Sequence, residues 1–158
     1  PDAALYWDTN VWPYSSDWAS SNDHALMVAL FGAIQDGDLG DTDPDRLHAA
    51  GLSSGGYMTS RMALSYPGRF RSLAVLSASW ATCAGAVCAV PSLDTDHPPT
   101  LFVHGTADTV VPLWTARLYT GALNDAGVPW SLVEVSGGGH AWFEETPAAV
   151  VDWFEAHP

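Results

Sequence analysis

The sequence predicts an α/β fold with a mostly parallel β-sheet and helices on both faces of that sheet. From residue 46 onward, apolar strand-like runs alternate with helix-like segments, a pattern typical of parallel sheets. The run over residues 100–104 is apolar with almost no interruption, as expected for a strand that is covered on both faces. With 158 residues, no internal repeat and no linker, we expect one domain over residues 1–158.

The individual elements follow from local signals in the chain. Ser21 or Asn22 can cap the first helix, and Gly127 is a natural C-terminal cap for a later one. Pro147 can open the last helix, because proline is favoured at the first helical position. In order, we predict a loop over 1–20, a helix over 23–34, an acidic turn over 36–45, a strand near 46–50, a helix near 54–66, a strand over 72–77, a loop over 79–99, a strand over 100–104, a helix over 113–126, a strand over 130–135, a flexible loop over 137–140 and a helix from 147.

The charge balance excludes several classes of partner. Eighteen acidic residues face five basic ones, all arginine, which gives a formal net charge of −13. Such a surface repels nucleic acid and anionic lipid, so we expect neither as a partner. No apolar run approaches the length of a membrane span. The acidic run 36–43 resembles a calcium loop only loosely, because it departs from the EF-hand spacing, and we expect a solvated turn there.

Two cysteines bear on the compartment in which the protein works. Cys83 and Cys88 lie five positions apart in a Gly/Ala-rich loop, and we favour a local disulfide over the alternative of two buried thiols. Two sulfurs with no neighbouring histidine do not complete a zinc shell, so no metal site is predicted. A disulfide indicates an oxidising compartment and therefore a secreted or periplasmic protein.

The segment from Gly51 to Gly55 fits the pattern G-x-S-x-G. In serine hydrolases built on an α/β sheet, this pattern forms a sharp turn from a strand into a helix, with the serine at its apex. Ser53 occupies that position here, between a strand-like run and a helix-like run. Its alternative role is an ordinary helix N-cap. Ser54 occupies the variable position after the serine, and we expect its backbone N–H to be an oxyanion donor.

Two later residues follow Ser53 in the chain order of α/β-hydrolases, which is nucleophile, then acid, then base. Asp108 follows the predicted strand 100–104, and His140 follows the strand 130–135. A serine hydroxyl needs a base to take its proton and an acid to orient that base, and open α/β sheets place their sites at the carboxyl ends of strands. Asp108 could instead cap a turn, and His140 could be a surface residue of a glycine-rich loop. Each of the other five histidines either precedes the acid in the chain or does not lie in a loop directly after a strand, so each fits the role of base less well.

Two tryptophans lie next to the predicted site in sequence. Trp80 comes just after the strand 72–77, and Trp142 lies two residues after His140. Either could form the wall of a cleft that binds an apolar acyl group, and a purely structural role is equally compatible with each.

Three motifs, at residues 51–59, 104–112 and 138–142, together resemble those of the polyhydroxybutyrate-depolymerase-like esterases. These are α/β-hydrolases that need no cofactor, and many are secreted. The resemblance covers roughly residues 5–157 and implies Ser53 as nucleophile, Asp108 as acid and His140 as base. It implies a small-molecule or polymeric ester as substrate, and places the cysteine loop near the cleft. It leaves the oligomeric state unknown.

The resemblance also exposes one departure. Family members carry earlier strands, one of which ends in a His-Gly turn that supplies a second oxyanion N–H, and nothing before residue 46 fits that element. We therefore expect an N-terminally incomplete α/β-hydrolase fold, the C-terminal portion of the full domain. Three functions follow from these motifs: an ester hydrolase, a serine peptidase of the prolyl oligopeptidase type, and a non-catalytic remnant.

Overall fold

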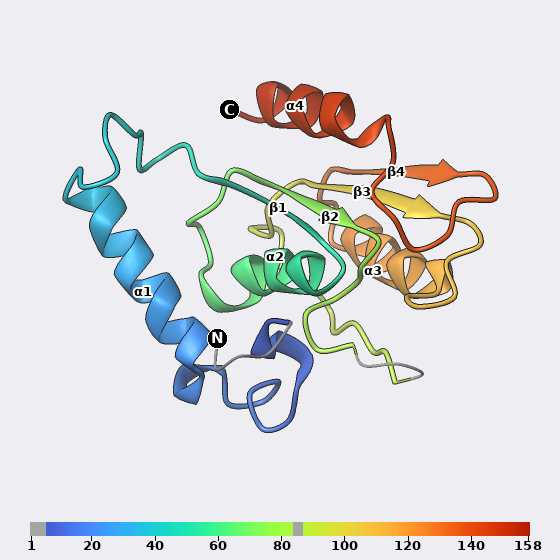
Figure 1. Cartoon of the computed structure of the whole chain (residues 1–158), viewed down its shortest axis with the longest axis horizontal. Coiled ribbons are helices and arrows are strands. Elements are labelled where there is room, and N and C mark those ends of the chain that lie inside the picture. The colour runs from blue at the N-terminus through green and yellow to red at the C-terminus, as the bar shows by residue number, and fades with distance from the viewer. Residues whose placement is uncertain (1–5, 84–86) are drawn as a thin grey trace.

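The computed structural model describes residues 6–83 and 87–158 (Figure 1). Two short 3-10 helices open the described chain, and helices and parallel strands then alternate. The elements are η1 Asp8–Asn10, η2 Trp18–Ser20, α1 Asn22–Gln35, β1 His48–Leu52, α2 Ser54–Ser65, β2 Ser72–Leu76, β3 Thr100–Gly105, α3 Leu113–Asp125, β4 Trp130–Val135 and α4 Thr146–Ala156.

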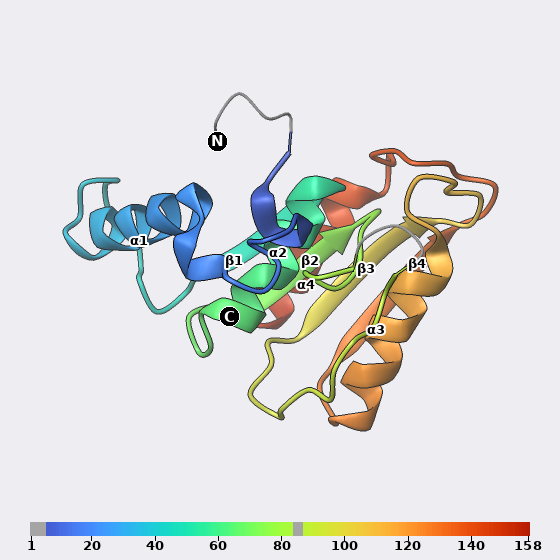
Figure 2. The same cartoon turned by 90° about the horizontal axis from the view of Figure 1, so that it is seen from below.

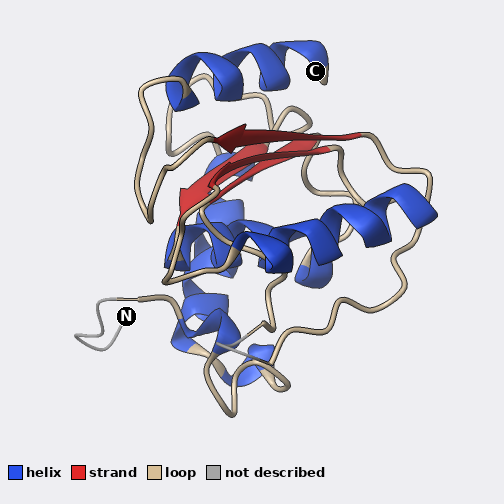
Figure 3. Cartoon of the chain, turned by 90° about the vertical axis from the view of Figure 1, so that its right-hand side faces the viewer, coloured by secondary structure: helices blue, strands red, loops and turns tan. Residues whose placement is uncertain are grey.

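Four parallel strands form one sheet in the order β1-β2-β3-β4. Helices α2 and α3 cover one face of the sheet, and α4 covers the other (Figure 3). Helix α1 lies beyond α2, at the opposite end of the molecule from α3 (Figure 2). The central strands β2 and β3 are buried along their whole length, whereas β1 and β4 are only partly covered. This arrangement confirms the predicted parallel α/β sheet with helices on both faces.

The apolar core is divided by the sheet into two layers. On one side, Val75 and Phe102 of the central strands pack against Tyr57 of α2 and Tyr119 of α3. On the other side, the alternate residues of the same strands pack against α4, as the two-residue side-chain period of a strand requires. A third cluster joins α1 and η2 to α2 through Phe31, Trp18 and Met62.

The segment before α1 is fastened to the rest of the chain by a buried arginine. Arg61 of α2 donates hydrogen bonds to the hydroxyl and the carbonyl oxygen of Thr9 and to the carbonyl of Ser15. Its guanidinium also lies over the Trp18 ring, 5.1 Å from the centroid. Burial lowers the pKa of Arg61 to about 10. The fixed fork of donors suits this position, because it satisfies carbonyl groups that would otherwise be buried without partners.

The observed elements differ from the predicted ones at a few boundaries. Strand β1 continues to Leu52 rather than ending near residue 50, because its pairing with β2 extends through Gly51 and Leu52 up to the serine. The predicted loop 1–20 contains η1 and η2, which close on short-range bonds such as Val11 N–H to the Asp8 carbonyl. The parts of the loop predictions that fall on residues 1–5 and 84–86 lie outside the described residues.

The two cysteines form the predicted disulfide, Cys83–Cys88. Cys83 is buried against the core layer beside α3, so the bridge ties its loop to that layer. Within the described residues, no helix combines the length and the apolar character that crossing a membrane would need.

Candidate active site

Ser53 stands at the junction between β1 and α2 in a conformation that few side-chain-bearing residues adopt. Its backbone has φ 56° and ψ −120°. Positive φ values of this kind cost free energy and occur where the surrounding structure enforces them, often at functional sites. Here the Ser53 N–H donates to the Leu76 carbonyl of the neighbouring strand, and its own carbonyl accepts from the N–H of Tyr57. The turn is therefore held on both sides.

Two glycines make this turn possible. A Cβ atom on Gly51 would lie 2.2 Å from the carbonyl oxygen of Gly55, and a Cβ on Gly56 would lie 2.4 Å from the Cβ of Ala78. Both distances are far below van der Waals contact, so the backbone can approach this closely only at glycine. Gly55, in contrast, has open space where a Cβ would be. Of the two glycines in the G-x-S-x-G pattern, only Gly51 is required by a close contact, and Gly56, which is also required, lies outside the pattern.

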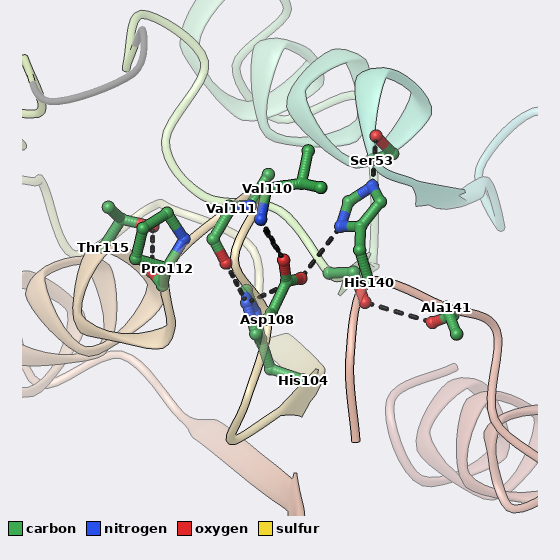
Figure 4. A network of polar contacts seen from close by, with 10 residues as sticks. Ser53, His104, Asp108, Val110, Val111, Pro112, Thr115, His140 and Ala141 are labelled. Carbon is green, nitrogen blue, oxygen red and sulfur yellow. Dashed lines mark hydrogen bonds and ion pairs between the residues drawn. The ribbon is translucent and has the colours of Figure 1, made fainter. Parts of the chain in front are cut away.

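Ser53, His140 and Asp108 meet at the carboxyl end of the sheet (Figure 4). The Nε2 atom of His140 lies 2.8 Å from the Ser53 hydroxyl oxygen, and its Nδ1 atom lies 2.8 Å from Oδ2 of Asp108. An ionised carboxylate can only accept hydrogen bonds, so Nδ1 carries the proton and Nε2 is left to accept from the serine. This is the arrangement in which an imidazole can remove a proton from a hydroxyl.

The carboxyl group of Asp108 is buried and fully engaged. Its Oδ1 accepts hydrogen bonds from the backbone N–H groups of Val110 and Val111, and its Oδ2 faces His140. Burial alone would raise the pKa of this carboxyl, but the hydrogen bonds from His140 and the two valines together hold it below its usual value. Asp108 is therefore ionised, as an orienting acid must be.

A second histidine lies behind the acid and was not predicted as part of the site. His104, near the end of β3, is completely buried, with its Nε2 atom 2.8 Å from the carbonyl of Val111 and 3.4 Å from Oδ2 of Asp108. Its Nδ1 atom has no hydrogen-bond partner among the described residues. Burial is the largest of several influences that together lower the pKa of His104. The sequence places His104 four residues before Asp108, which is the only local signal for this contact.

The loop that carries Asp108, residues 105–111 (the acid loop), is joined to the loop that carries His140, residues 136–145 (the base loop). The N–H of Ala107 donates to the Gly138 carbonyl, and the N–H of Gly137 donates to the Thr106 hydroxyl. The base loop is also held from β2, because the hydroxyl of Ser77 donates to the carbonyl of Ala141, 3.1 Å away. His140 is thus positioned by bonds from its loop to the segments that follow β3 and β2.

A pocket of about 260 Å³ opens beside the serine. Its lining residues come from the segment before α1, from the Ser53 turn and from the acid loop. They are Tyr6, Asn10, Ser53, Ser54, Tyr57, Val110 and Val111. Burial, with a smaller contribution from nearby Asp108, raises the pKa of Tyr57 to about 12, so its hydroxyl stays neutral. The lining is mostly aromatic and aliphatic with a few polar groups, as in sites for small organic ligands.

The wall formed by Tyr6 and Asn10 is fixed by bonds to distant parts of the chain. The N–H of Trp7 donates to the hydroxyl of Ser54 at 2.7 Å, and the side-chain amide of Asn10 donates to the carbonyl of Cys83 at 2.9 Å. Through this second bond the disulfide-bonded residue contacts the pocket wall. Sequence reasoning missed Tyr6 and Asn10, because no local pattern marks them.

The remaining predicted site residues occupy different environments. Ser54 is the first residue of α2 and lines the pocket, and its N–H is among those that the helix itself does not use. Trp80 lies in the core, 3% exposed, with its ring edge-to-face against Tyr119, and is not among the residues that line the pocket. Trp142 is 52% exposed on the base loop and does not line the pocket either.

The described residues contain no group of three or more His, Cys, Asp or Glu side chains placed to hold a metal ion. Between residues 6 and 47 they contain η1, η2 and α1, and no strand.

Known proteins resemble this chain over much of its length. The chain is 46% identical over 157 residues to the poly(3-hydroxyoctanoate) depolymerase of Pseudomonas fluorescens, covering 99% of this chain and 56% of that protein. It is 27% identical over 124 residues to the carboxylesterase SOBER1 of Arabidopsis thaliana, covering 78% of this chain and 54% of the relative. The chain thus spans little more than half the length of these relatives. A family model described as the prolyl oligopeptidase family matches residues 85–157.

Solved structures share the fold. The crystal structure of Arabidopsis thaliana SOBER1 superposes with a TM-score of 0.64 at 24% identity, covering 85% of this chain and 63% of that one. An α/β hydrolase from a deep-sea metagenome library superposes with a TM-score of 0.67 at 16% identity, covering 87% and 66% of the two chains. Over 157 of its residues the chain is thus similar to a poly(3-hydroxyoctanoate) depolymerase, and it has the fold of the α/β hydrolases among these solved structures.

Proposed function

We propose that the protein hydrolyses carboxylic esters through an acyl-enzyme formed on Ser53. The observation that carries this proposal is the pair of 2.8 Å contacts that join Ser53 to His140 and His140 to Asp108. The depolymerase and carboxylesterase relatives support an ester rather than an amide as the bond that is cleaved. The prolyl oligopeptidase match covers only residues 85–157 and does not favour a peptidase over these relatives.

The proposed reaction has two stages. His140 Nε2 takes the proton of the Ser53 hydroxyl as the oxygen attacks the ester carbonyl, and Asp108 stabilises the imidazolium that forms. The N–H of Ser54, at the positive end of α2, stabilises the developing oxyanion. His140 then gives its proton to the departing alcohol. In the second stage a water molecule, activated by the same imidazole, releases the acid from Ser53.

The substrate we propose is an ester of a short or medium hydroxy acid, either free or at the end of a polyester. The pocket of about 260 Å³ lies just below the range of roughly 300–1,000 Å³ that holds drug-sized ligands, so it suits one such unit. The rest of a polymer would have to extend over the surface outside the pocket. The relative from Pseudomonas fluorescens, named for a hydroxyoctanoate polymer, supports this substrate class.

We further propose that the protein works outside the cytoplasm, in a secreted or periplasmic setting. The Cys83–Cys88 disulfide supports this location, because such bonds persist in oxidising compartments.

Substitution of the nucleophile tests the activity. In the natural full-length protein that carries this chain, Ser53→Ala should lower the hydrolysis of p-nitrophenyl butanoate by about a thousandfold or more. Ser54→Ala is the matched control, because it keeps the backbone N–H of residue 54 and should lower the rate far less. Retained ester hydrolysis in Ser53→Ala would contradict the proposal, and a preference for aminoacyl amides over esters would favour the peptidase.

A further inference from the structure

We propose that His104 is a positioning residue for the triad, which holds the acid loop, residues 105–111, so that Asp108 faces His140. The inference rests on the proposed ester hydrolysis and adds a residue that lies outside the Ser53, His140 and Asp108 arrangement. His104 acts through Val111 and Asp108, the two residues that its Nε2 atom approaches.

The first argument is the geometry around Val111. The carbonyl oxygen of Val111 lies 2.8 Å from His104 Nε2, while the N–H of the same residue donates to Oδ1 of Asp108, also at 2.8 Å. Val111 is therefore held at both of its backbone groups, and the loop is closed back onto the strand from which it departs. Figure 4 shows His104 on the far side of Asp108 from His140.

The second argument concerns the proton on His104. A carbonyl oxygen can only accept, so Nε2 of His104 carries the hydrogen and Nδ1 carries a lone pair. The same nitrogen lies 3.4 Å from Oδ2 of Asp108, the oxygen that His140 also contacts. One carboxylate oxygen thus lies close to a protonated nitrogen of each imidazole. The His104 N–H reduces the negative charge that Oδ2 presents to His140.

The third argument is that His104 is built to stay neutral. It is completely buried, and among the residues that the structure describes a proton on its Nδ1 would have no acceptor. The charged and titratable groups that face this region are Asp108 and His140, Glu134 of β4 and Tyr57 of α2. Glu134 is paired with Arg117 of α3, so its negative charge is balanced without a charged form of His104. His104 is therefore a fixed donor rather than a second base.

Two substitutions of His104 by amide side chains of different length test the role of its Nε2 atom. Glutamine at position 104 can place an N–H near the position of Nε2, whereas asparagine reaches only to that of Nδ1. In the natural full-length protein, we expect His104→Gln to keep kcat/KM within about threefold, and His104→Asn to lower it about tenfold. His104→Asn should also move the acid limb of the kcat/KM profile to higher pH, because an unshielded Asp108 holds the charged form of His140 more firmly.

His97 supplies the matched control. It is buried, and both of its ring nitrogens are bonded, to the Pro98 carbonyl and the Tyr119 hydroxyl, away from the triad. His97→Gln and His97→Asn should leave the pH profile unchanged, whatever they do to the melting temperature. If folded His104→Asn has the same pH profile and kcat/KM as His97→Asn, the inference is wrong.

Two further measurements separate the possible failures. Ser53→Ala, assayed in parallel, decides whether the proposed ester hydrolysis itself holds, independently of His104. If His104→Asn does not fold, nitrogen NMR of the wild-type protein decides the question through the ring tautomer of His104. We expect the Nε2–H form at all pH values from about 6 to 8. The Nδ1–H form would overturn the inference, because it could not donate to Val111.

Discussion

Gly51 and Gly55 face each other across the Ser53 turn so closely that a methyl group on Gly51 would lie 2.2 Å from the carbonyl oxygen of Gly55. The relationship is not symmetrical, because a methyl group on Gly55 would meet nothing within 4 Å. Position 51 must therefore be glycine, because the backbone of Gly55 leaves no room for a side chain there. Position 55 has room for one.

This asymmetry predicts different outcomes for two alanine substitutions. Gly51→Ala should push the turn apart, lowering both the melting temperature and kcat, because the clash is with backbone that cannot move aside. Gly55→Ala is the control, and should leave stability within about 1 kcal/mol of the wild type. Thermal melting with ester kinetics on both variants checks this. Equal stability of the two variants would show that the turn relaxes more easily than the structure indicates.

Two buried histidines predict how stability depends on pH. Burial is the main cause that lowers the pKa of His97 and of His104 in the folded protein. Below the unfolded value of about 6.5 the unfolded chain therefore binds protons that the folded chain does not, and the unfolding free energy falls as pH falls. Each residue contributes a slope of at most about 1.4 kcal/mol per pH unit. Chemical denaturation at pH 7.5 and 5.5 measures this loss, and His97→Gln should reduce it. An unchanged pH dependence in that variant would contradict the assignment.

Arg61 predicts a stability effect with a consequence for the pocket. Arg61→Leu leaves the Thr9 carbonyl without its donor in a buried position, which should cost about 1–3 kcal/mol. The Tyr6 and Asn10 wall should loosen, so KM should rise more than kcat falls. Arg69→Leu removes a half-buried arginine that lies over Phe31, and serves as the control with a smaller effect on KM. Urea denaturation and ester kinetics measure both quantities; a KM that is the same in both variants would contradict this link.

Tyr6 predicts a change in substrate preference. It lines the pocket while remaining 53% exposed, so Tyr6→Ala should enlarge the pocket without disturbing the core. We expect the ratio of kcat/KM for p-nitrophenyl octanoate to that for the butanoate to change by about threefold or more. Trp130→Ala, at the amino end of β4 and away from the serine, should leave the ratio unchanged. An unchanged ratio in Tyr6→Ala would show that Tyr6 does not determine which ester is preferred.

The fold and the triad geometry could be anticipated because their signals are local. Alternating strand-like and helix-like runs suffice for a parallel sheet, and Ser53, Asp108 and His140 each follow a strand whose carboxyl end reaches the same edge. The sequence predicts an end of β1 two residues too early, because Gly51 indicates a turn whereas the strand pairing continues through it.

The pocket wall could not be anticipated, because it is made by contacts between distant segments. Nothing around Tyr6 or Asn10 indicates that they lie beside Ser53. Trp80 shows the opposite difficulty. Its position just after a strand suggested the site, yet the chain turns its ring into the core against Tyr119. His104 carried a weak local signal, its spacing of four residues from Asp108.

The bonds that fasten this wall connect residues far apart along the chain. Asn10 and the Cys83 carbonyl are 73 positions apart, and Trp7 and Ser54 are 47 apart. Contacts between residues so far apart along the chain cost more loop-closure entropy than the pairing of successive strands. We therefore expect the wall to form after the sheet and to be lost before it. The contact between Ser53 and His140 spans 87 positions and falls under the same argument, whereas the bond from Gly137 to Thr106 spans only 31 positions. On warming, the pocket wall and the contact of His140 with Ser53 would then be lost while the sheet and the bond between its two neighbouring loops persist.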